Sequence, residues 1–308
     1  MLGRIQKWLR PTAPIVHHLR LRGVIQDGRP GTLSLRNLEK ALDKAFDKSN
    51  KRLAAVAVSI NSPGGSPVQS ELIANRMRAL SQETNIPLYT FAEDVAASGG
   101  YWLLTAGDKC YCAGTSLVGS IGVVTGGFGF PSAIEKLGVE RRVLTAGENK
   151  SRNDPFMPVK AEDVAKTTHI LDSMHELFKA QVLERRADAL AAEKHGQIFS
   201  GDVWLGGDAK TLGLVDGLES DVRGAMRREF GDDVEMKPIA PGPQIPWPFS
   251  SFQGAAAAAD FGGVSGEACS LDFGSGERGG GMSVSVSADS ILSAVEERAI
   301  WAPYQTTM

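Results

Sequence analysis

Short apolar runs alternate with helix-like segments from residue 14 to about residue 239, and this alternation strongly limits the folds open to the chain. Leu21–Ile25, Ala54–Ile60 and Pro87–Phe91 have the length of strands. The second run is apolar except for Ser59, as expected for a strand covered on both faces. Strands separated by helices predict an α/β fold with a mainly parallel sheet and flanking helices.

The segments between these runs have the spacing of amphipathic helices. Ser34 stands at an N-cap position ahead of apolar residues that share one face. Further helices are predicted after Ser66, from Tyr101 to Ala106, and from Ala161 to about Leu190. Strands and helices together predict one layered domain over residues 14–240.

Both ends of the chain differ from this central domain. Residues 1–13 form a basic segment in which residues 2–10 share an apolar helical face. This pattern is compatible with a targeting peptide, with peripheral membrane contact, or with a frayed tail before the first strand. Residues 241–308 are rich in Pro, Ala and Gly and are predicted to form a linker and a disordered tail. Residues 283–301 are either a docking element or a weakly ordered terminus.

Composition excludes several classes of protein. The net charge of −3 over 308 residues gives no bulk positive field for nucleic acid. Three cysteines, Cys110, Cys112 and Cys269, fit neither a disulfide framework nor a zinc knuckle, which favours a reducing compartment. The uncharged stretch Cys110–Ile134 holds six glycines and a proline, so no transmembrane helix is predicted there. Cytoplasm, a membrane surface and an organelle such as the mitochondrion all stay open.

Two glycine-rich turns follow apolar strands, where α/β sheets place ligands and catalytic groups. In the first, Pro63–Gly65 can expose backbone N–H groups to an anion or oxyanion. The second contains Ser98 between small residues, with the N–H of Gly99 beside it. Ser98 is therefore a candidate nucleophile, and the alternative is that it caps the following helix.

A serine nucleophile needs a base, and none of the five histidines fits that role from the sequence. They also form no metal-binding motif, so neither a metal nor a cofactor is expected. A lysine can act as the base if burial lowers its pKa from about 10.4 towards 7 or 8. Lys150 lies in a polar loop after a predicted strand, Arg141–Leu144, and is otherwise an ordinary surface lysine.

In order and spacing, these segments resemble the signal peptide peptidase A family of serine–lysine endopeptidases, in its short form with one copy of the motifs. The resemblance covers residues 14–240 and rests on Asn61–Gly65, Ala97–Tyr101, Gly119–Val123, Gly147–Phe156 and the closing residues 201–216. It implies a layered fold of the ClpP/crotonase type and peptide-bond hydrolysis without metal or nucleotide.

The resemblance also implies site residues and partners. Matched by position, the nucleophile is Ser98, the general base is Lys150, the oxyanion hole is Gly65 with Gly99, and the supporting residues are Gly64 and Ser120. We expect the Lys150 loop to be buried against the site, with Cys110–Ile134 as its dry wall. Related peptidases form rings in which the dyad is shared between subunits, so a homo-oligomer is expected. The substrates implied are unfolded or membrane-derived peptides that bind as an added strand.

Three other readings compete with this one. A Clp proteolytic subunit shares the Ser-Pro-Gly-Gly turn but needs a histidine near the place that Val123 holds. A crotonase-like acyl-CoA enzyme needs only two backbone N–H groups and leaves Ser98 and Lys150 unexplained. A catalytically inactive scaffold that binds peptides is compatible with every motif.

Overall fold

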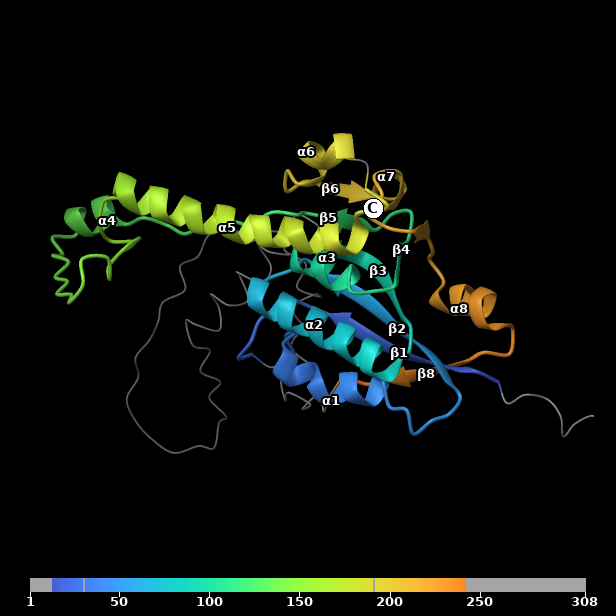
Figure 1. The fold of residues 1–308 in the computed structure, drawn as a ribbon. Helices are drawn as coiled ribbons and strands as arrows, with labels where there is room; N and C mark the ends of the chain where they lie inside the picture. The colour runs from blue at the N-terminus through green and yellow to red at the C-terminus, as the bar shows by residue number, and fades with distance from the viewer. Residues whose placement is uncertain (1–12, 30, 191, 242–308) are drawn as a thin grey trace, which may run out of the picture. The chain divides into compact units, whose positions relative to one another are not determined.

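The computed structural model describes residues 13–29, 31–190 and 192–241 (Figure 1). The chain divides into two compact units, residues 1–242 and 243–308, and the second lies outside the described residues. The predictions for residues 1–12 and for the tail beyond residue 241 therefore concern residues that the structure does not describe.

The first unit alternates strands and helices. Its strands are β1 (Ile15–Arg22), β2 (Leu53–Ser62), β3 (Leu88–Ala97), β4 (Lys109–Cys112), β5 (Leu117–Gly119), β6 (Val203–Leu205), β7 (Gly217–Leu218) and β8 (Glu235–Ile239). Its helices are α1 (Leu35–Ala45), α2 (Pro67–Thr84), α3 (Gly99–Leu104), α4 (Pro131–Lys136), α5 (Ala161–Arg186), the 3₁₀ turn η3 (Ala192–Lys194), α6 (His195–Ile198), α7 (Gly206–Thr211) and α8 (Val222–Phe230).

The described strands form one sheet of eight strands in the order β6-β5-β3-β2-β1-β8. β4 pairs with the first half of β3 and also with β7, and β5 pairs with the second half of β3. Only the β5–β6 pair is antiparallel among these strands. The predicted α/β class with a mainly parallel sheet is thus confirmed.

Two predicted elements differ from the structure. The first strand begins at Ile15 rather than Leu21, because the polar residues before Leu21 still pair with β2 and β8. The predicted strand Arg141–Leu144 is wrong: this segment is irregular and exposed. The predicted cap is confirmed, since the Ser34 side chain accepts a hydrogen bond from the Asn37 N–H at the start of α1.

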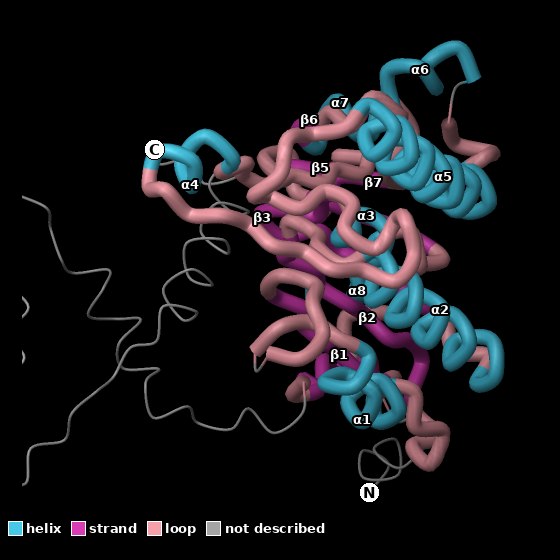
Figure 2. The backbone as a smooth tube through the Cα atoms, turned by 90° about the vertical axis from the view of Figure 1, so that its left-hand side faces the viewer, coloured by secondary structure: helices cyan, strands magenta, loops and turns pink. Residues whose placement is uncertain are grey.

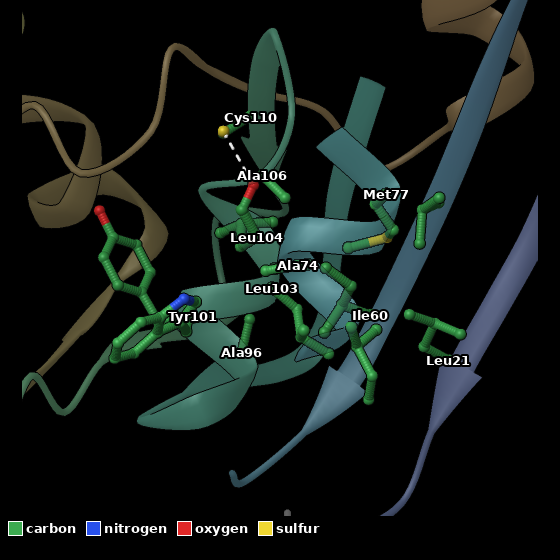
Figure 3. Close-up of a cluster of buried hydrophobic side chains, with 14 of the residues drawn as sticks. Leu21, Ile60, Ala74, Met77, Ala96, Tyr101, Leu103, Leu104, Ala106 and Cys110 are labelled. Carbon is green, nitrogen blue, oxygen red and sulfur yellow. Dashed lines mark hydrogen bonds between the residues drawn. The ribbon is translucent and has the colours of Figure 1, made fainter. Parts of the chain in front are cut away.

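The main core lies between the sheet and the helices α1, α2 and α3, which cover one face (Figure 2). Leu21, Ile60 and Met77 of α2 lie together in this core (Figure 3). Leu103 of α3 points towards Ile60, whereas Tyr101 of α3 points away from these residues and donates to the Leu214 carbonyl. All five side chains are fully buried. A leucine or isoleucine buried this completely typically contributes about 1.5–3 kcal/mol through lost apolar surface.

The opposite face of the sheet is covered over part of its length by α8. Val16, Phe91 and Met226 belong to this second cluster. Towards the carboxyl ends of β1, β2 and β3 the same face becomes polar, with His18 and Ser59 joined by a 2.8 Å hydrogen bond. Burial, and secondarily the charge of Arg20, lowers the pKa of His18.

The long helix α5 is anchored at its C-terminal half. Phe178 stacks on Trp102 of α3 with ring centroids 4.8 Å apart. Arg186 is buried, donates to the carbonyl of Gly213 and pairs with Asp216 at 2.8 Å, which ties α5 to the closing segment. Within the described residues, no helix has the length and apolar character needed to cross a membrane.

Candidate active site

Ser98 occupies the junction between β3 and α3 in an unusual backbone conformation. Its φ is 52° and its ψ is −123°, although positive φ is disfavoured for any residue with a Cβ. Its side chain makes no capping hydrogen bond to α3, so the structure gives no support to the N-cap alternative. The residue is half-buried between fully buried neighbours. A serine held in this way presents its hydroxyl at the end of a strand, as a nucleophile requires.

The Pro63–Gly65 turn lies directly against Ser98. A Cβ added to Gly64 would come within 2.8 Å of both the Gly99 nitrogen and the Ser98 Cβ. A Cβ added to Gly65 would come within 2.1 Å of the Ile25 carbonyl oxygen. Both glycines also have positive φ, 104° and 141°. The absence of a side chain at Gly64 therefore allows the two turns to approach each other, and its absence at Gly65 allows the first turn to lie against the Ile25 backbone.

Two backbone donors beside Ser98 have no acceptor among the described residues: the N–H groups of Gly65 and Gly99. Gly65 forms a parallel bridge with Ile25, in which the bonds run from Ile25 N to Gly64 O and from Ser66 N to Ile25 O. This pattern turns the N–H of Gly65 away from Ile25. The N–H of Gly99 is free because it lies in the first turn of α3. Two such donors match the requirement of an oxyanion hole.

The remaining predicted supporting residues also lie near this junction. The N–H of Gly64 is bonded to the Ser62 Oγ at 3.2 Å, so Gly64 shapes the turn rather than offering a donor. Ser120 follows β5, whose Gly119 carbonyl accepts the Ser98 N–H at 2.8 Å. Ser120 itself has a φ of 52° and donates its N–H to the Asp202 carbonyl. The role of Ser120 stays a prediction.

Within one chain, the Lys150 segment is held at the N-terminal end of α5. Lys150 is exposed, and its segment is held on the first two turns of α5 by an Arg152–Asp163 ion pair of 3.2 Å and by a hydrogen bond from Asn153. By contrast, α3 stacks on Phe178. Phe178 is fifteen residues further along the helix than Asp163, or about 22 Å at 1.5 Å per residue. The expectation that the Lys150 loop is buried against the site is therefore wrong within one chain.

Only the first part of the stretch predicted to shield the site from water is buried. In the stretch Cys110–Ile134, the first part contributes buried residues such as Val118 and Ile121, whereas residues from Val124 onward are mostly exposed. We call residues 124–160 the arm. Most of the large apolar side chains of the arm are exposed, among them Val124, Phe128, Leu137, Leu144 and Val159.

Other reactive side chains in the described residues offer no competing site. Cys110 and Cys112 are free, buried thiols, and burial raises the pKa of Cys112 to about 11, so it stays protonated at neutral pH. His175 donates to the Ile121 carbonyl at 3.0 Å, which helps to hold the segment after β5. No group of three His, Cys, Asp or Glu residues suited to a metal ion occurs in the described ranges.

Sequence reasoning missed three contributors near the site. Ile25 clamps the Gly65 turn through its backbone, and its Cδ1 lies 3.2 Å from where a Gly99 Cβ would stand. The pair Asn61–Asp94 joins the strands that lead into the two turns, and His175 holds the segment after β5. Asn61 was visible as part of the first motif, but no sequence signal joins it to Asp94 or marks Ile25.

Comparisons with known proteins agree with this geometry. The family model described as "Peptidase family S49" matches residues 81–229, a range that includes Ser98 and Lys150 and excludes the Gly65 turn. A putative signal peptide peptidase SppA of Enterococcus faecium is 29% identical over 59% of this chain and 53% of its own length. Protease 4 of Haemophilus influenzae is 32% identical over 59% of this chain and 29% of its own length.

A further match extends beyond the peptidase domain. A protein of Brucella abortus named Na(+)/H(+) antiporter NhaA is 42% identical over 93% of this chain and 36% of its own length. This match covers 93% of the chain, which is more than residues 1–240 make up. The similarity therefore reaches into residues 241–308. The chain spans about a third of that protein, so the antiporter name is not transferred to it.

Fold, site geometry and comparisons together define the class of protein. The chain belongs to peptidase family S49, the family of the signal peptide peptidase A proteins. The chain spans between about a quarter and two thirds of the length of the protease-named relatives it matches.

Proposed function

We propose that the protein is a serine endopeptidase in which Ser98 is the nucleophile. The observation that supports this most directly is the junction of β3 and α3, where a serine with positive φ lies beside the two unbonded N–H groups of Gly65 and Gly99. A developing oxyanion beside Ser98 would accept hydrogen bonds from both donors, and such donors are typically worth about 10²–10³ in kcat each.

Hydrolysis would proceed in two halves. The Lys150 amine, in its neutral form, takes the proton of the Ser98 hydroxyl while Oγ attacks the carbonyl carbon of the peptide. The tetrahedral intermediate collapses to an acyl-enzyme, and the lysine ammonium returns the proton to the leaving amine. Water then attacks the ester with the same base, which releases the carboxylic acid and restores the Ser98 hydroxyl. Neither metal nor nucleotide enters these steps.

We propose that a second copy of the chain supplies Lys150. Within one chain the Lys150 segment is held about 22 Å along α5 from the α3 contact, at 1.5 Å per residue. The exposed apolar side chains of the arm, such as Phe128 and Leu144, are typical of a surface that another protein covers. A homo-oligomer in which each arm reaches a neighbour would bury these side chains and complete the dyad.

The proposed substrates are unfolded or membrane-derived peptides. The names of the relatives from Enterococcus faecium and Arabidopsis thaliana, a putative signal peptide peptidase and a serine protease, support a peptide substrate. An extended peptide could pair with the irregular segment that follows β5, next to Ser98, as an added strand.

The test is labelling by a serine-reactive fluorophosphonate, followed by peptide hydrolysis. Wild-type protein should be labelled at one residue, and both Ser98→Ala and Lys150→Ala should lose labelling and hydrolysis. Ser173→Ala, which removes an exposed hydroxyl on α5, is the control and should still be labelled. A well-folded oligomer that is not labelled would favour a peptide-binding scaffold or an acyl-CoA enzyme, and binding of a coenzyme A thioester separates those two.

Mixing two inactive variants tests the shared dyad. When Ser98→Ala and Lys150→Ala chains assemble together, a site is complete wherever an intact serine meets an intact lysine from its neighbour. Random assembly makes about a quarter of the sites complete, so about a quarter of the wild-type activity should return. A dyad formed within one chain would give no recovery, and that result would defeat the sharing while leaving Ser98 as nucleophile.

A further inference from the structure

A side-chain hydrogen bond joins the ends of the two strands that lead into the site. The Nδ2 of Asn61, near the end of β2, donates to the Oδ2 of Asp94, near the end of β3, at 2.6 Å. Asn61 immediately precedes the turn that holds Gly65, and Asp94 lies four residues before Ser98. The bond therefore spans the two strand ends from which the oxyanion donors and the nucleophile extend.

The backbone of β3 is irregular at this point. Ile60 pairs with Ala92 and Ser62 pairs with Ala96, so two steps along β2 correspond to four along β3. Glu93 to Val95 lie opposite the single residue Asn61 and form a bulge in β3. Bulges beside active sites commonly redirect a side chain, and here the exposed Asp94 reaches the buried Asn61.

The orientation of the Asn61 amide is fixed by this carboxylate. Asn61 is 3% exposed, and its Oδ1 has no hydrogen-bond partner among the described residues. Turning the amide over would bring Oδ1 against the Asp94 carboxylate, which accepts hydrogen bonds and cannot donate one when ionised. A buried acceptor without a donor costs stability, so packing alone does not account for an asparagine at this position.

We propose that Asn61 and Asp94 are a positioning pair that sets the distance between the Gly65 N–H and Ser98. This inference rests on the proposed function, because it gives the pair a role in transition-state stabilisation. Displacement of an oxyanion donor weakens its bond to the transition state more than it weakens substrate binding. The pair should therefore affect kcat and leave KM nearly unchanged.

The experiment compares three variants of the full-length protein. Asp94→Ala removes the acceptor and should lower kcat about tenfold or more, with KM within about twofold of wild type. Asp94→Asn retains an oxygen that accepts from Asn61 and should stay within about threefold of wild type. Glu93→Ala is the matched control, because it removes the neighbouring carboxylate, which pairs with Arg20 at 2.8 Å on the surface. It should leave kcat unchanged.

Equal kcat values for Asp94→Ala and Glu93→Ala would overturn the inference, and so would equal losses in Asp94→Ala and Asp94→Asn. Hydrogen exchange gives a readout that needs no activity. The amides of Gly64 and Ser66, which are bonded to Ser62 and Ile25, should exchange faster in Asp94→Ala than in Glu93→Ala. Equal exchange rates in Asp94→Ala and Glu93→Ala would also overturn the inference. A wild-type protein that hydrolyses no peptide would defeat the proposed function. Hydrogen exchange would still show whether the Asn61–Asp94 pair positions the Gly65 turn.

Discussion

The Ser98 region and the arm are built in opposite ways. Around Ser98, three strand ends and the start of α3 are joined by short backbone bonds and by glycines that permit contact between turns. The arm is largely irregular and exposed outside α4, and ion pairs such as Arg141–Asp154 fix its local shape. One region is preorganised by its own chain, and the other leaves large apolar side chains exposed. Under the proposed sharing, each chain would contribute to two sites, with Ser98 in one and Lys150 in the other.

The largest effect is expected at Gly64, and Gly147, which has nearly the same φ, serves as the comparison. Gly64 in the turn has a φ of 104° and Gly147 in the arm has a φ of 103°. Gly64→Ala places a Cβ against Ser98 and Gly99 and should lower kcat about 100-fold or more. Gly147→Ala meets only the Lys150 Cγ at 3.5 Å.

The activity of Gly147→Ala should therefore stay within about tenfold of wild type. The backbone strain that alanine introduces is similar in the two variants, about 1–2 kcal/mol. Peptide hydrolysis together with thermal unfolding separates the two contributions. Equal activity losses in both variants would show that positive φ, rather than the close approach of the two turns, limits the reaction.

A smaller effect is expected from a charge on the arm. Leu144 is fully exposed, so Leu144→Glu should leave the melting temperature of the chain nearly unchanged. If a neighbour covers Leu144, association should weaken by about 2 kcal/mol or more, which is roughly 30-fold. Light scattering and activity at several protein concentrations measure both quantities. Leu205→Glu, at a half-exposed position on β6, is the control. If Leu144→Glu forms an oligomer of the wild-type size, the arm does not form the interface.

The smallest effect concerns pH and again compares the two regions. His18 near the strand ends has a lowered pKa, first through burial and then through Arg20. The neutral form is favoured in the folded state, so stability is full above the ordinary pKa of 6.5 and falls as the pH drops towards the lower folded value. His18→Gln should make the melting temperature less dependent on pH between 7 and 5. Thr145→Ala, at an exposed position in the arm, removes no titratable group and should leave that dependence unchanged.

The sequence allowed the Ser98 half of the site to be predicted because local rules determine it. Apolar strands, paired glycines and a serine at a strand end follow from backbone sterics and alternation within a few residues. Gly64 does lie against Ser98 in the structure, as the motif order led us to expect.

The arm could not be predicted in the same way. Arg141–Leu144 has the composition of a strand, yet no strand among the described residues pairs with it. The position of Lys150 depends on ion pairs to α5 that join residues eleven positions apart, Arg152 and Asp163, and on a surface that the chain itself does not cover. The bond between Asn61 and Asp94 depends on a bulge, which leaves no pattern in the sequence.

The anchoring of the Lys150 segment on the first turns of α5 has a consequence for control. Under the proposed sharing, a single newly made chain carries the nucleophile and the base but cannot bring them together. Such a chain is inert, and proteolysis begins only when the local concentration allows assembly. Dilution would then act as a brake without an inhibitor or a propeptide.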